Sequence, residues 1–251
     1  MSTEHRARPY PHHAAMIHDL LSGLDYTQGH LDRAAEHGRT SLAIYQRTQS
    51  PDHVWLADAY TSLANVEQRR RNFDSALAQY ENALALRRRH LGDDHYQTGL
   101  SEASVAETLV ELERYDDALP HVREAERIYD RGSTRRPRVQ AWILTVHGET
   151  LVGQGQFSAA IPVLEQALER FGDGAAIPTN HALAMFTLAR ALHGLGRDGD
   201  RVRSLAERAH TIFTAQGATD AHFRDAVARF LERLSARQVP HSPKPRSGPT
   251  K

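Results

Sequence analysis

The sequence predicts an all-α protein in which about five helix pairs stack into a solenoid and one further helix covers the C-terminal end. The 251-residue chain contains 35 alanines against 11 prolines, a composition that favours helices. A pattern of aromatic and small residues recurs every 42 residues, as expected of stacked repeats. No long stretch alternates apolar and polar residues as a half-buried strand would.

The second helix of each repeat carries the clearest signal. Phe73, Tyr115 and Phe157 lie 42 residues apart, and alanines follow them at matched positions. Within one copy, Ala76 and Ala83 are seven residues apart and therefore share a helix face, where small side chains let two helices approach. The expected helix pairs, in order, are 14–28 with 31–48, 53–70 with 73–90, 95–112 with 115–131, 136–154 with 157–171, and 180–195 with 199–216. They divide a solenoid over 14–236 into repeats 14–50, 53–92, 95–133, 136–173 and 180–217.

The last repeat of a stack exposes an apolar face that needs a cover. Residues 219–236 supply one, because Phe223, Val227 and Phe230 follow helical spacing on a single face. We interpret this segment as a capping helix rather than as a partner-binding helix. Residues 1–13 are expected to form a flexible tail, and the proline-rich residues 237–251 a disordered one.

The segment YTSLANVEQRRRNFDSALAQYENALAL (60–86) resembles a tetratricopeptide repeat (TPR). The connector RRRHLGDDHYQTGL (87–100) is similar to that of the kinesin light chain type of this repeat. The ending LARALHGLGRDGDRVRSLAERA (188–209) is similar to repeat arrays of bacterial signalling proteins. The resemblance covers about residues 14–217. It implies a right-handed α-solenoid in which the first helix of each pair lines a concave groove.

Composition argues against several classes of protein. There are 31 basic and 31 acidic residues, so the chain lacks the positive field of general nucleic-acid binders. It has no cysteine, no apolar run that could span a membrane and no apolar leader, so we expect a cytoplasmic protein. The 29 arginines against two lysines indicate a GC-rich, bacterial source. Glycine-rich phosphate loops and nucleophile motifs are also absent, so no catalytic residue and no cofactor is predicted.

Two clusters of polar residues have alternative interpretations. His90, Asp93, Asp94 and His95 could bind zinc, but capping of the following helix is the favoured interpretation, and no metal site is predicted. Arginines gather at 69–71, 87–89 and 135–138. The first two groups are expected to complement helix C-termini, and the alternative is a patch for phosphate or nucleic acid.

The resemblance to the tetratricopeptide repeat implies which positions of each repeat place their side chains in the groove. Asn65 matches a position where the family uses asparagine to hold a peptide backbone. Trp142 is the expected anchor for a partner; alternatively it packs on the preceding pair and only stabilises the array. The glutamates near it predict a partner with basic and apolar residues. The predicted groove residues are Asp58, Thr61, Asn65, Gln68, Arg69, Glu107, Glu111, Trp142, Thr145, Glu149, Phe186 and Arg190.

The sequence therefore predicts a non-enzymatic scaffold that binds a protein segment or peptide in this groove. Two alternatives stay open: a regulator that responds to a short peptide, and an accessory subunit of an enzyme complex whose arginines contact phosphate or RNA. No membrane partner is expected, nucleic acid is disfavoured, and the oligomeric state is left open.

Overall fold

A computed structural model describes residues 11–48, 53–131, 136–172, 178–197 and 199–236. These residues form eleven α-helices and one 3-10 helix, with no strand among them. None of these helices is both long and apolar enough to cross a membrane. In chain order they are α1 (Pro11–Thr27), α2 (Leu31–Thr48), α3 (Trp55–Arg69), α4 (Phe73–Leu91), α5 (Tyr96–Glu111), α6 (Tyr115–Arg131), α7 (Pro137–Gly153), α8 (Phe157–Phe171), α9 (Pro178–Gly194), α10 (Gly199–Ala215), η1 (Gly217–Asp220) and α11 (Ala221–Ala236).

The ten helices of the predicted pairs are present, with ends that differ from the expected ones by at most three residues. The largest difference is at the start of the chain, where α1 begins at Pro11, inside the segment expected to be a flexible tail. Proline suits the first turn of a helix because it has no N–H to leave unpaired there. The remainder of that tail, 1–10, and the C-terminal tail, 237–251, lie outside the described residues.

The turn inside each helix pair has the same backbone geometry. At Arg71 and Glu113 the chain adopts a left-handed conformation, with φ of 64° and 58°, although neither residue is glycine. The next N–H then reaches back five residues, from Asn72 to the Glu67 carbonyl (2.9 Å), which closes the helix end. The other pairs use glycine for this conformation, at Gly29, Gly155 and Gly196.

Small residues allow close helix packing at the predicted positions. Ala76, Ala118 and Ala160 are fully buried. Gly153 shows how tight the approach is, because a Cβ built there would lie 2.3 Å from the Tyr115 ring. Tyr115 and Phe157, which begin α6 and α8, therefore pack on Gly153 and Gly194 near the ends of the next first helices.

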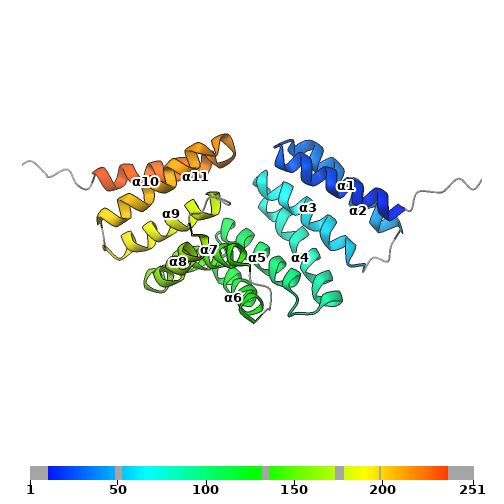
Figure 1. Ribbon diagram of the computed structural model, residues 1–251, viewed down its shortest axis with the longest axis horizontal. Coiled ribbons are helices and arrows are strands. Elements are labelled where there is room, and N and C mark those ends of the chain that lie inside the picture. Colours follow the sequence, from blue (N-terminus) through cyan, green and yellow to red (C-terminus); the bar gives the residue numbers. More distant parts are fainter. Residues whose placement is uncertain (1–10, 49–52, 132–135, 173–177, 198, 237–251) are drawn as a thin grey trace, which may run out of the picture.

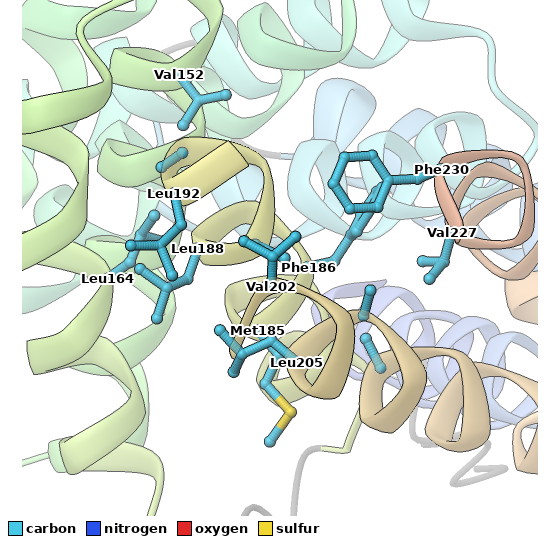
Figure 2. Close-up of a cluster of buried hydrophobic side chains, with 14 of the residues drawn as sticks. Val152, Leu164, Met185, Phe186, Leu188, Leu192, Val202, Leu205, Val227 and Phe230 are labelled. Carbon is cyan, nitrogen blue, oxygen red and sulfur yellow. The ribbon is translucent and has the colours of Figure 1, made fainter. Parts of the chain in front are cut away.

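The helix pairs follow one another around an arch, with α1–α3 and α9–α11 on opposite sides of its concave face (Figure 1). The capping helix α11 packs on α10 and buries Val227 and Phe230. These two side chains join the large apolar cluster built by the last repeats (Figure 2). The prediction of a solenoid with a C-terminal capping helix is confirmed.

Candidate functional site

The concave side of the arch encloses a cavity of about 650 Å³. This volume is in the range of sites that hold small ligands or a few side chains of a partner. Helices from every repeat contribute to its lining, and the start of α11 adds further residues. The cavity is lined by Tyr26, Asn65, Gln68, Arg69, Arg71, Phe73, Tyr80, Ser104, Glu107, Val110, Glu111, Trp142, Glu149, Thr179, Asn180, Leu183, Asp220, Ala221, His222 and Phe223.

Seven of the twelve predicted groove residues line this cavity. Asn65, Glu107 and Glu149 form its regular part, since they occupy the same position in α3, α5 and α7 at intervals of 42 residues. The other four are Gln68, Arg69, Glu111 and Trp142.

The remaining predicted residues lie elsewhere. Asp58 is exposed and pairs with Arg87, with 2.9 Å between Oδ1 and Nη2. The Thr61 hydroxyl donates to the Ala57 carbonyl at 2.7 Å, within its own helix. Arg190 is exposed, and its guanidinium lies 5.9 Å from the centre of the Phe186 ring.

The expected placement of Thr145 and Phe186 on the groove surface is wrong. Thr145 is 1% exposed, and its hydroxyl donates to the Ala141 carbonyl. Phe186 is 8% exposed and meets the Phe230 ring edge-on at 5.6 Å between centroids (Figure 2). The capping helix explains Phe186, because Phe230 of α11 reaches this part of α9 and the two rings belong to one apolar cluster.

A hydrogen-bond network joins four of the predicted residues, in α3, α5 and α7, with Tyr80 of α4. The Trp142 Nε1–H donates to Glu107 Oε1 at 2.9 Å, and the Gln68 amide donates to Glu107 Oε2 at 3.0 Å. The Tyr80 hydroxyl lies 2.6 Å from Asn65 Oδ1 and 2.8 Å from Gln68 Oε1. Since a hydroxyl has one proton, it can donate to only one of these oxygens at a time. The network therefore links α3, α4, α5 and α7 along the lining of the cavity.

The position of Trp142 is compatible with both interpretations that the sequence left open, and its role as an anchor for a partner stays a prediction. Its indole lines the cavity and binds Glu107. The ring also packs against the apolar cluster that contains Ala103, Val122 and Ile143, so it stabilises the stack as well.

Three glutamates share the cavity, and their pKa values are all raised. Burial raises the pKa of Glu149 to about 8, with the charge of Glu111 adding to the effect and Arg190 opposing it. Burial also raises the pKa of Glu107, against the hydrogen bonds from Trp142 and Gln68. For Glu111 the same desolvation raises the pKa, and the charge of Arg71 opposes it.

Several residues of the cavity were not predicted. Tyr26 and Phe73 come from helices α1 and α4, and His222 and Phe223 come from the capping helix. Asp220 accepts a hydrogen bond from the Thr179 hydroxyl at 2.5 Å, which ties η1 to the start of α9. Phe73 had a visible signal as the aromatic of its repeat, whereas no sequence pattern indicated the contribution of η1 and α11.

The arginine clusters make protein contacts where the structure describes them. Arg69 donates to the Tyr26 carbonyl at 2.8 Å and lies over its ring. Arg87 is buried and bridges Asp58 and Ser101. These contacts join successive helices, so they do not support the alternative of a phosphate or nucleic-acid patch.

The connector with the two histidines has a capping role. His95 is the N-cap of α5, and its Nδ1 accepts from the Gln97 N–H at 3.3 Å. Asp94 pairs with Arg127 at 2.5 Å. The favoured interpretation of His95 as a helix cap is confirmed.

Solved structures with a similar arrangement include repeat proteins. The structure of the Podosopora anserina "kinesin light chain nearly identical TPR-like repeats" has a TM-score of 0.63 at 17% identity, covering 84% of this chain and 99% of the other. BtubC (BKLC) from P. vanneervenii has a TM-score of 0.61 at 18% identity, covering 96% and 87%. The apo form of RapI has a TM-score of 0.61 at 13% identity, covering 90% and 85%. These likenesses concern the fold.

Comparison with curated proteins gives no match. Two family models, both described as tetratricopeptide repeat, match residues 12–89 and 55–131, and residues 145–209. Neither describes a catalytic domain. Together with the arrangement of helix pairs, these matches show that the chain belongs to the tetratricopeptide repeat family.

Proposed function

We propose that this protein is a non-enzymatic scaffold that binds a segment of a partner protein in the concave cavity. The observation that carries the proposal is the convergence of equivalent positions from three repeats, Asn65, Glu107 and Glu149, with Trp142 in one cavity of about 650 Å³. Repeat proteins of this family generally bind protein or peptide partners. A cavity of this size accommodates a few side chains of such a segment.

The chemistry of the cavity favours a basic side chain next to an apolar one. Glu149 makes no ion pair within 4 Å among the described residues, and a cation from outside would relieve the repulsion between Glu107, Glu111 and Glu149. Trp142 and Phe73 offer flat apolar surface beside these carboxylates. A desolvated cation can also interact with an aromatic face, at about 2 kcal/mol in favourable cases.

Selection from a displayed library of random peptides on the full chain tests this function. We expect the enriched peptides to carry Arg or Lys next to an aliphatic or aromatic residue. Replacement of the basic residue by Gln should weaken binding by roughly tenfold or more. Enrichment of peptides without a basic residue would contradict the proposed chemistry.

Point variants locate the binding site. Trp55→Phe leaves Trp142 as the one tryptophan of the chain, so its fluorescence reports binding in the cavity. In this background Glu149→Gln should weaken binding of a selected peptide, and Glu81→Gln, an exposed change on α4, should have no effect. Trp142→Ala should abolish capture while the variant stays folded; undiminished capture by that folded variant would place the site elsewhere.

A further inference from the structure

The exposed large apolar side chains of the described surface gather on one helix. In α1, Met16 is 50% exposed, Ile17 56%, Leu20 73% and Leu24 53%. The one other such residue in the described part of the chain is Trp55, at 38%. Contiguous exposed apolar surface of this kind marks an interaction site in soluble proteins.

The repeat explains why this face is apolar. The residues that follow Ile17 at intervals of 42 are buried in α3, α5 and α7; they are Ala59, Ser101 and Ile143. The residues that follow Leu24 at the same intervals are buried too; they are Val66, Thr108 and Thr150. There they pack toward the preceding pair; Val66, for example, lies in one cluster with Ala34 and Ala35 of α2. In α1 the same face has no preceding pair among the described residues, so it is a stacking surface without a partner.

The other end of the stack does not match this surface. The exposed residues of α1 between 13 and 27 include no Lys, Arg, Asp or Glu. On α11, by contrast, the exposed residues include Asp225, Arg229, Glu232 and Arg233. Stacking α1 of one copy on α11 of another would bury these charges against apolar side chains, at a large desolvation cost. End-to-end stacking is therefore disfavoured.

The face of α1 does match itself. The exposed residues of α1 are spaced symmetrically about Leu20: Met16 and Leu24 are each four residues from it, and Ile17 and Gly23 are each three. A second α1 running antiparallel would therefore place Met16 opposite Leu24, Ile17 opposite Gly23 and Leu20 opposite Leu20. Gly23 has open space around it, since nothing lies within 4 Å of a Cβ built there, and the large Ile17 would fit above it. This is the self-complementarity that a two-fold interface requires.

We propose that the exposed face of α1 is an interface at which two copies of this chain pair antiparallel about a two-fold axis at Leu20. The contact is one helix wide, well below the area of a standard stable interface, so the dimer should be weak and dependent on concentration. The pairing leaves the concave cavity accessible, because it uses the outer end of the stack. It is independent of the function proposed above.

Sedimentation equilibrium of the full chain, from micromolar to submillimolar concentration, tests the pairing. We expect a monomer–dimer equilibrium in the wild type. Leu20→Arg should abolish it, because two like charges would meet on the axis, and Ala85→Arg, at an exposed position of α4, should leave it unchanged. A wild type that stays monomeric throughout would overturn the proposal. Dimerisation only after deletion of residues 1–10 would also overturn it, and would show that this segment covers the face.

A pair of double variants tests the antiparallel register. In Met16→Lys/Leu24→Glu, each lysine meets a glutamate of the other copy, whereas in Met16→Lys/Leu24→Lys all four groups repel. Positions 16 and 24 are eight residues apart, so the two groups do not interact within one helix. We expect the Lys/Glu variant to dimerise roughly tenfold more tightly than the Lys/Lys variant at low salt. Equal affinities would exclude this register.

Discussion

Replacement of Glu149 by Gln should stabilise the protein at alkaline pH and have little effect at acidic pH. The side chain is partly buried on the concave face, and burial together with the charge of Glu111 raises its pKa from 4.5 to about 8. Gln has nearly the same shape and can remain in the cavity without a charge. The variant therefore separates the cost of the carboxylate from the packing of the side chain.

The direction in which pH changes the free energy of unfolding follows from the pKa of Glu149 in the unfolded and in the folded chain. Below pH 4.5 the Glu149 carboxyl is protonated in both the folded and the unfolded chain, and its full contribution to stability is present. Between pH 4.5 and 8 the unfolded chain releases this proton and the folded chain retains it, so the free energy of unfolding falls as pH rises. Above pH 8 the folded protein holds a buried carboxylate, and the contribution is lost.

The pKa difference sets an upper bound of roughly 5 kcal/mol, at about 1.36 kcal/mol per pKa unit. The cavity is open to water on one side, which screens the charge, so we expect Glu149→Gln to gain about 1–3 kcal/mol at alkaline pH. Urea unfolding at pH 5, 7 and 9 measures this, with Glu81→Gln on the exposed face of α4 as the matched control. Equal pH dependence in the wild type and in Glu149→Gln would refute the reasoning, as would a variant less stable than the wild type at pH 9.

Three further predictions concern the repeat architecture. Gly153→Ala should lower the free energy of unfolding by about 1–3 kcal/mol, because the new Cβ would lie 2.3 Å from the Tyr115 ring, and thermal unfolding measures the loss. Glu113→Gly should raise the free energy of unfolding by about 0.5–1 kcal/mol, because Glu113 has a left-handed φ of 58° that glycine adopts more easily. An unchanged or lower melting temperature would argue against strain at this residue. Deletion of 219–251 should expose the apolar cluster and lower solubility, whereas deletion of 240–251, which has no apolar periodicity, should have no effect; equal results would contradict the capping role of α11.

The repeat could be predicted from sequence because its positions are set by local packing. Phe73, Tyr115 and Phe157 recur at fixed intervals, and the helix ends follow from the turns between them. The same register brought Asn65 and Glu107 to one face. A 42-residue period thus fixes the helices and the face that each first helix presents.

The closure of the cavity could not be predicted in the same way. His222 of α11, which follows the fifth repeat, lies near Arg71. This proximity depends on small rotations between successive helix pairs, which add up along the stack. Phe186 shows the related error at a chain end. Its spacing is that of a groove residue, but the neighbour that buries it, Phe230, belongs to a helix outside the repeat pattern.

Glu149 differs from two buried carboxylates that lie elsewhere in the described structure, Glu102 and Asp25. Glu102 is buried and meets Arg88 at 2.5 Å and His121 at 2.7 Å. Asp25 is buried beside Arg33 at 3.3 Å. In both places a cation of the same chain offsets the cost of desolvation. Glu149 instead lies near two further carboxylates, and its one opposing charge, Arg190, is too distant for an ion pair. Packing of the repeat does not require a charge there, because the equivalent position in α9 is alanine, Ala191. A carboxylate that destabilises the fold and faces a cavity is expected where a cation of a ligand pairs with it. A basic ligand should therefore stabilise the protein most at alkaline pH, where Glu149→Gln is also expected to stabilise it.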